Sequence, residues 1–166
     1  MDRLWSPWRY RYVSTCGETH GCIFCDKPAE QKDEENLIVH RGRLCYVLLN
    51  LYPYTNGHLM VAPYAHVAEL DELDTEAASE LMALTQSSVR HLKAAYKPHG
   101  LNVGMNLGEC AGAGVAGHLH LHIVPRWVGD ANFMTVVAET RVMPEELSET
   151  YRRLKAAFED QPLSHV

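Results

Sequence analysis

The feature that most constrains this chain is a run in which histidine alternates with aliphatic residues, His-Leu-His-Leu-His-Ile-Val at 118–124. Successive side chains of a β-strand point to opposite faces, so a strand over these residues places three imidazoles on one face, about 6.6–6.8 Å apart. The aliphatic residues then face a core. A helix would instead put His120 opposite the other two histidines. Three imidazoles on one face of a half-buried strand suit phosphate chemistry or metal binding.

Length and composition predict one domain with a sizeable core, since the 166 residues are 46% hydrophobic. The net charge of −6 argues against non-specific binding to nucleic acid but not against a small anionic ligand. No apolar run approaches the ~20 residues of a membrane span, and the first ten residues do not resemble a signal peptide. An odd count of five cysteines fits a reducing compartment, so we expect a cytoplasmic protein.

The chain divides into an N-terminal arm and a single domain. Residues 1–20 mix aromatic and basic side chains without periodicity. Such a segment can bind nucleic acid, but we favour an arm that packs its rings on the domain or on a second subunit. Residues 21–166 are expected to form the domain, with a core over about 21–127 and a C-terminal extension over 128–166. The charged stretch 26–36 is expected to be a loop.

Hydrophobic patterning predicts an α+β domain with a mainly antiparallel sheet of about five strands, one long helix and a C-terminal helix. Strands are expected at 37–40, 44–50, 58–62, 101–107 and 118–124. The long helix is predicted over 75–97, with Asp74 as N-cap, and the last helix opens at Pro144. The long helix carries an apolar stripe of Ala78, Leu81, Met82, Thr85, Val89, Leu92 and Tyr96, and the last helix one of Leu147, Tyr151, Leu154 and Phe158.

The alternating histidines support a definite chemistry. A neutral imidazole is a competent nucleophile near pH 7, and its attack on an α-phosphorus gives a covalent nucleotidyl-histidine. Neighbouring imidazoles can donate to the non-bridging oxygens or protonate the leaving oxygen. The Gly/Ala-rich stretch 108–117 lets backbone N–H groups approach phosphate oxygens closely.

A second motif, Cys22-Ile-Phe-Cys25, is half of a common zinc site. The chain has no second C-x2-C, so two histidines would have to complete a Cys2His2 set. A redox pair or two buried thiols are the alternatives. Spacing does not identify the partner histidines, which could be His20, His40, His58, His66, His91, His99 or members of the 118–122 run.

Together these residues resemble the histidine triad (HIT) family, whose signature His-φ-His-φ-His-φ-φ is matched at every position of 118–124. The resemblance covers roughly residues 20–127 and includes the stretches 56–63 and 102–106. The stretches 50–60 and 125–134 look like the subgroup of bacterial diadenosine tetraphosphate phosphorylases. The resemblance implies a HIT-like fold and a homodimer of α+β protomers that binds a nucleoside phosphate.

The family pattern assigns roles to individual residues. It implies that His120 is the nucleophile and that His122 and His58 contact the phosphate and steady His120. Asn106 would also contact phosphate, and Asn50 would hold the ribose hydroxyls.

For the cysteine pair, the resemblance implies a structural zinc ion bound by Cys22, Cys25, His66 and His118. Four protein ligands leave no open coordination position, so such a metal is structural rather than catalytic.

One departure from the family pattern lies just before the triad. Many members carry Gln-Ser or Gln-Thr where this chain has Gly114 and Val115, so a hydroxyl that could meet the phosphate is missing. We expect both residues to line the nucleotide site, with the backbone N–H of Val115 in place of the hydroxyl. The departure agrees with the phosphorylase-like subgroup.

The sequence thus predicts a hydrolase or transferase that cleaves dinucleoside polyphosphates through nucleotidyl-His120, with phosphorolysis slightly favoured over hydrolysis. A nucleotide-binding regulatory module with little turnover is the alternative. The expected partners are a nucleoside phosphate or dinucleoside polyphosphate and a second copy of the chain, with neither nucleic acid nor membrane.

Overall fold

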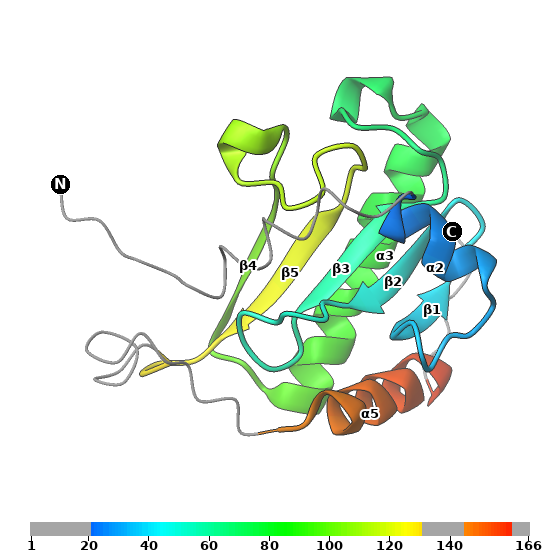
Figure 1. The fold of residues 1–166 in the computed structure, drawn as a ribbon. Coiled ribbons are helices and arrows are strands. Elements are labelled where there is room, and N and C mark those ends of the chain that lie inside the picture. Colours follow the sequence, from blue (N-terminus) through cyan, green and yellow to red (C-terminus); the bar gives the residue numbers. More distant parts are fainter. Residues whose placement is uncertain (1–20, 131–144, 161–166) are drawn as a thin grey trace, which may run out of the picture.

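The core of the molecule is a five-stranded sheet in the order β1-β2-β3-β5-β4, in which every neighbouring pair is antiparallel. A computed structural model describes residues 21–130 and 145–160, so the N-terminal arm and part of the C-terminal extension lie outside the described residues. The predicted α+β class is confirmed (Figure 1). The strands are β1 (Ile38–Arg41), β2 (Cys45–Leu49), β3 (Leu59–Pro63), β4 (Gly100–Met105) and β5 (Leu121–Arg126).

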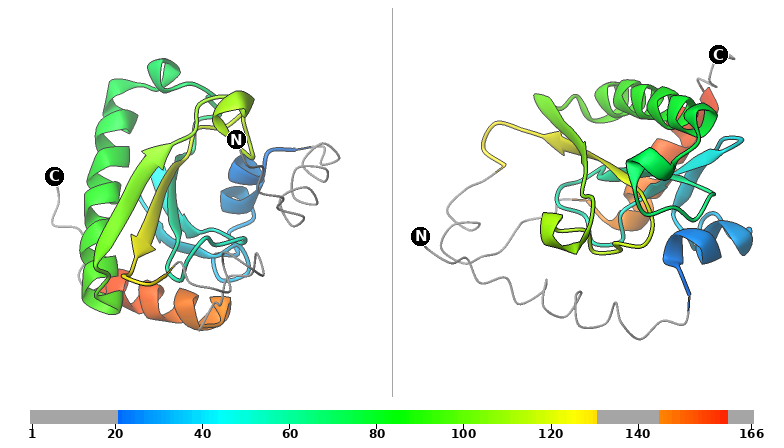
Figure 2. Two further views of the ribbon diagram at one scale, coloured as in Figure 1. Left: turned by 90° about the vertical axis from the view of Figure 1, so that its left-hand side faces the viewer. Right: turned by 90° about the horizontal axis from the view of Figure 1, so that it is seen from above.

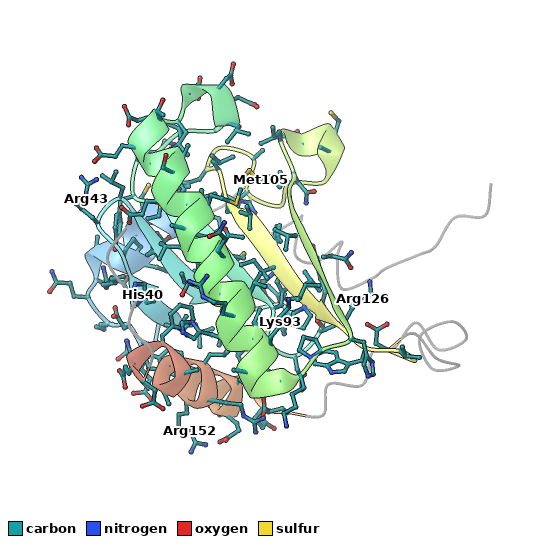
Figure 3. The ribbon with its side chains drawn as sticks, turned by 180° about the vertical axis from the view of Figure 1, so that it is seen from behind. His40, Arg43, Lys93, Met105, Arg126 and Arg152 are labelled. Carbon is teal, nitrogen blue, oxygen red and sulfur yellow. The ribbon has the colours of Figure 1, made fainter. Side chains whose placement is uncertain are left out.

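Helices cover both faces of this sheet. The long helix α3 (Thr75–Tyr96) lies across one face, with α5 (Leu147–Asp160) packed beside it (Figure 3). The short helix α2 (Ile23–Ala29) lies on the opposite face (Figure 2). Two 3-10 turns, η1 (Leu70–Glu72) and η2 (Glu109–Ala111), interrupt the connections before α3 and before β5. None of the described helices is both long and apolar enough to cross a bilayer.

Alternation along the strands produces two separate hydrophobic clusters. On the α3 side, Val47, Val61 and Ile123 belong to a large cluster that includes residues of α3 and α5. On the α2 side, a smaller cluster comprises Phe24, Ile38, Tyr46, Leu48, Met60 and Ala62. The histidines of the 118–122 run face this second side, as the alternation predicts.

The strand β5 begins at Leu121, three residues later than predicted. The residues before it leave the ladder because the N–H of Leu119 donates to the carbonyl of Val67, in the segment after β3, at 2.7 Å. Side chains still alternate across this stretch: Leu119 lies in the large cluster, whereas His118 and His120 pack on Phe24.

The prediction of a loop over 26–36 is wrong for its first residues, because α2 extends to Ala29 and contains Pro28. A proline inside a helix normally leaves the carbonyl four residues earlier without its hydrogen bond. Here that carbonyl belongs to Phe24, and it accepts a hydrogen bond from the hydroxyl of Tyr46 at 2.7 Å. A side chain of the sheet therefore compensates for the proline and anchors α2.

Two more side chains hold the end of α2. The amide of Asn36 donates to the carbonyl of Lys27 at 3.1 Å, and the guanidinium of Arg41 donates to that of Pro28 at 3.0 Å. Arg41 also pairs with Asp33 at 2.7 Å. These bonds satisfy carbonyls that a helix end leaves open, and they fix α2 against β1.

The long helix begins at Thr75 as predicted and ends at Tyr96, one residue before the predicted end, but its buried face is broader. Asp74 caps it by accepting the N–H of Glu76 at 2.8 Å. Met82, assigned to the apolar stripe, is 50% exposed, which is a wrong prediction. The buried set adds Ala77, Leu84, Ser87, Ser88 and His91, because α3 packs against both the sheet and α5.

Candidate active site and metal cluster

Four side chains predicted to bind a metal meet on the α2 side of the sheet. Cys22 and Cys25 lie at the start of α2, three residues apart and therefore on one face of its first turn. His66 follows β3 and His118 precedes β5, and the bond from Leu119 to Val67 draws these two segments together. One nitrogen or sulfur atom from each of the four lies within 4.8 Å of the others.

The distances inside this cluster match a tetrahedral site. The sulfur of Cys22 lies 3.3 Å from Nδ1 of His118, and that of Cys25 lies 3.3 Å from Nδ1 of His66 and 3.6 Å from Nδ1 of His118. The two Nδ1 atoms are 3.3 Å apart. Zinc with bonds of about 2.3 Å to sulfur and about 2.0 Å to nitrogen leaves tetrahedral ligand atoms about 3.3–3.8 Å apart. The donor set and its spacing therefore fit zinc.

The protonation state of the cluster also suits a cation. Nε2 of His118 lies 2.9 Å from the carbonyl of Pro63 and must donate to it, so Nδ1 keeps its lone pair for the cluster. Burial and the adjacent Cys22 raise the pKa of the Cys25 thiol to about 11. A bound divalent cation reverses this effect, because a coordinating thiol loses its proton outright.

A second group of histidines lies farther along the same face. His58, immediately before β3, is fully buried, and its Nε2 lies 3.0 Å from Nδ1 of His122 on β5. Burial, followed by the neighbouring imidazoles, lowers the pKa of His58 to about 3 and that of His122 to about 4. Both rings are therefore neutral near pH 7.

Hydrogen bonds from the β2–β3 loop fix the tautomers of this pair. Nδ1 of His58 accepts the N–H of Tyr54 at 3.1 Å and faces the amide nitrogen of Asn50 at 3.4 Å. The amide oxygen of Asn50 accepts the N–H of Tyr52 at 3.0 Å, which sets the orientation of that amide. Nε2–H of His58 must then donate to Nδ1 of His122, so His122 carries its own proton on Nε2.

The middle histidine has the opposite tautomer. Nδ1 of His120 lies 2.8 Å from the carbonyl of His118, so it carries the proton and leaves Nε2 with a lone pair. Burial lowers the pKa of His120, against the opposing effect of this hydrogen bond. The ring of His122 stands edge-on to that of His120, with centroids 4.8 Å apart. A ring nitrogen with a lone pair and a ring that carries an N–H donor are thus neighbours.

Phe24 is a residue of the site that sequence reasoning missed. Its ring stacks on His120, with centroids 4.6 Å apart and planes inclined by 26°, and it also contacts the ring of His118. It lies between the two cysteines of the C-x2-C motif, so its place in that motif was the available signal.

Comparison with known proteins agrees with this geometry. Residues 31–128, more than half of the chain, match the family model described as the HIT domain. The chain belongs to the histidine triad family. It is 45% identical over 169 residues to a Mycobacterium tuberculosis protein named AP-4-A phosphorylase, covering 98% of this chain and 87% of that protein.

Solved histidine triad structures share the fold. A Zn-bound family protein from Mycobacterium smegmatis superposes with a TM-score of 0.69 at 27% identity, covering 84% of this chain and 94% of the other. A protein from Sulfolobus tokodaii described as a hypothetical histidine triad nucleotide-binding protein gives a TM-score of 0.68 at 28% identity, with 84% of this chain and 93% of the other covered.

The remaining predicted nucleotide contacts lie beside the histidines or in the loop before them. Asn106 follows β4, and its amide donates to the carbonyl of Gly112 at 3.4 Å. Gly114 and Val115 are half-buried, and Val115 packs against the smaller hydrophobic cluster around Phe24. Asn50 lies on the Nδ1 side of His58, as described above. Their contacts with a nucleotide stay predictions.

A cavity of about 310 Å³ lies below the β2–β3 loop, at the start of α5. It borders His58 but neither His120 nor His122, so it is not the predicted phosphate site. Its lining comprises Leu49, Leu51, Pro53, Asn56, Gly57, His58, Glu145, Glu146, Leu147 and Thr150.

Proposed function

We propose that this chain cleaves dinucleoside polyphosphates of the diadenosine tetraphosphate type, with inorganic phosphate as the acceptor. The observation that carries the proposal is the tautomer of His120, whose proton is held on Nδ1 by a carbonyl while Nε2 stays free to attack. The relative named AP-4-A phosphorylase, similar over nearly the whole chain, supports both the substrate class and the acceptor.

The reaction proceeds in two displacement steps. Nε2 of His120 forms a bond to the α-phosphorus, and the bond from that phosphorus to the bridging oxygen breaks, so the nucleoside polyphosphate leaves with the electron pair. The Nδ1 proton of His120 stays on Nδ1, where it donates to the carbonyl of His118. An oxygen of inorganic phosphate then attacks the same phosphorus, breaks the P–N bond and restores the imidazole.

The neighbouring histidines stabilise the charge on the phosphoryl oxygens. Nε2–H of His122 is directed away from His58 and can donate to a non-bridging oxygen as negative charge builds up. His58 strengthens this donor because it donates to the other nitrogen of the same ring. We assign Asn106, Gly114 and Val115 to the nucleotide site and Asn50 to the ribose, as the family resemblance implies.

We also propose that the Cys2His2 cluster holds a structural zinc ion. The ion would be bound by Cys22, Cys25, His66 and His118, all through protein atoms, and it would cross-link α2 to the ends of β3 and β5. The Zn-bound relative supports this assignment.

The decisive experiment combines product analysis with adduct mapping. Diadenosine tetraphosphate should yield ATP and ADP when inorganic phosphate is present. Without phosphate, a nucleotidyl adduct should be trapped and found by mass spectrometry on the peptide that contains His120. An adduct on another side chain, or rapid turnover without an adduct, would reject the mechanism. Tight nucleotide binding with negligible turnover would instead indicate a regulatory module.

The predicted homodimer finds support at one edge of the sheet. The strand β4 is the last in the sheet order, and Val103 at its centre is 48% exposed. An edge strand of this kind can pair with a second copy. Light scattering should give twice the chain mass, and Val103→Glu should shift the population toward monomer. A monomeric wild type at micromolar concentration would contradict the dimer.

A further inference from the structure

We infer that Phe24 is a positioning residue for the nucleophile, and that the metal cluster acts on His120 through it. The inference rests on the proposed role of His120. Its basis is a juxtaposition: the residue between two cluster cysteines lies flat against the imidazole that carries the reaction.

The contact between the rings of Phe24 and His120 is close and buried from solvent. Phe24 is 2% exposed and His120 is 5% exposed, and the planes of their rings are inclined by only 26°. The plane of an imidazole is set by rotation about two side-chain bonds. The hydrogen bond to the carbonyl of His118 fixes one edge of the His120 ring. A flat contact on the face removes the remaining rotation, so the direction of Nε2 is fixed only when both contacts are present.

Both contacts come from residues that belong to the metal cluster or lie within its motif. His118 gives its imidazole to the cluster and its carbonyl to His120. Phe24 is separated by one residue or none from the ligand cysteines, so the position of its backbone follows theirs. The hydroxyl of Tyr46 holds the carbonyl of Phe24 from the sheet side. The cluster and Tyr46 therefore set where the ring of Phe24 lies.

The substitution Phe24→Leu tests this role because it keeps an apolar side chain but removes the flat ring. We expect kcat to fall by about 10- to 100-fold, as for a reacting atom misplaced by about 1 Å, while KM stays within about 2-fold. Zinc content should stay near one equivalent. Phe24→Tyr keeps the aromatic face and should restore most of kcat.

A second readout does not depend on turnover. Long-range proton–nitrogen NMR spectra of the histidine rings report which nitrogen carries the proton. Wild-type protein should show His120 as a single Nδ1–H tautomer, whereas Phe24→Leu should show nitrogen shifts averaged between tautomers. The signals of His122 should change less, because its partner His58 is untouched.

The matched control is Phe158→Leu on the other side of the sheet. Phe158 is 3% exposed, stacks on His40 and packs at a tilt against His91, so its replacement removes a similar contact. It should lower thermal stability while leaving kcat and the His120 signals unchanged.

Three results would overturn the inference. Unchanged kcat and unchanged His120 signals in Phe24→Leu would show that the stacking has no positioning effect. Equal losses of kcat in both Leu variants would show a general stability effect. Loss of zinc from Phe24→Leu and also from Phe24→Met would place the role of the ring in the cluster rather than at the nucleophile.

A wild type without an adduct on His120 would refute the proposed function instead. The NMR result would still decide whether the stacking of Phe24 sets the tautomer of His120.

Discussion

His118 and His122 lie at opposite ends of the same run and face the same side of the sheet, yet their rings present opposite groups. The backbone carbonyl of Pro63 holds the proton of His118 on Nε2, so its Nδ1 offers a lone pair to the cysteines. His58 donates to Nδ1 of His122, so that ring offers a proton from Nε2. The atom that contacts the other nitrogen of each ring therefore decides what the ring offers. A lone pair suits a cation, and a proton suits an anion.

His120, between them, combines features of both ends. Like His118 it donates to a backbone carbonyl, but through the other nitrogen, so its lone pair is on Nε2 and points away from that carbonyl. Under the proposed function, three identical residues at regular spacing thus serve as a metal ligand, a nucleophile and a hydrogen-bond donor. Substitutions at each end should separate these functions.

The largest effect is expected from His120→Asn, which removes the nucleophile and should lower kcat by at least about 1000-fold. Zinc content should stay near one equivalent, because this residue donates no atom to the cluster. Steady-state kinetics with elemental analysis checks both. His99→Asn, an exposed histidine outside the site, is the control and should keep full activity. Activity within about 10-fold of wild type would contradict the assignment.

The next largest effect is expected from a substitution in the Cys2His2 cluster. Cys22→Ser should lower zinc content and destabilise the fold by on the order of 4 kcal/mol, as expected for loss of a structural metal. In a domain of this size, that corresponds to a fall in melting temperature of roughly 10 °C. Calorimetry and elemental analysis measure both. Cys110→Ser replaces an exposed cysteine outside the cluster and should change neither. A zinc-replete Cys22→Ser protein with unchanged stability would refute the cluster.

A smaller effect should follow from Asn50→Ala. If Asn50 acts only on the ribose, the loss in kcat/KM should disappear with substrates that lack both ribose hydroxyls. Its contact with His58 predicts that a loss of about 10-fold persists with those substrates, since the tautomer of His58 is then less firmly set. Parallel kinetics with the two substrate classes separates the two roles.

The last prediction concerns pH and the buried His58. Its pKa is lowered to about 3 in the folded state, below the ordinary value of about 6.5. The contribution of the neutral His58 ring to the free energy of unfolding is therefore complete above pH 6.5. That stability falls as pH drops toward 3, because only the unfolded chain takes up the proton.

The corresponding slope is up to about 1.4 kcal/mol per pH unit between pH 6 and 4. Urea unfolding of wild type and His58→Gln at several pH values should show a shallower slope for the variant. Ligand protonation at the cluster contributes to both proteins and cancels in the comparison. Equal slopes would contradict a buried, neutral His58.

Much of this site was predictable because its arrangement depends on residue type and spacing along the sequence. Alternation alone predicts that the three histidines share a face, and it assigns Leu121 and Ile123 to the core. The cluster was only half predictable from the residues, since His66 and His118 are 41 to 96 positions from the cysteines they approach. The family resemblance supplied those two partners, and the structure brings all four together.

What could not be predicted depends on backbone atoms. The carbonyls of Pro63 and His118 set two of the tautomers, and any residue at those positions would provide the same oxygen. The helix α2 was missed for a related reason. Pro28 normally argues against a helix, and only the folded chain brings the hydroxyl of Tyr46 to the carbonyl that the proline leaves open.

The neutral His58–His122 pair has a consequence for how a polyphosphate would be held. A lysine attracts phosphate through net charge, and dissolved ions screen that attraction over about 8–10 Å. Two uncharged rings joined by a hydrogen bond act through oriented dipoles at contact range instead. The part of the affinity that comes from this pair should therefore persist at ionic strengths that weaken a binding site made of basic side chains.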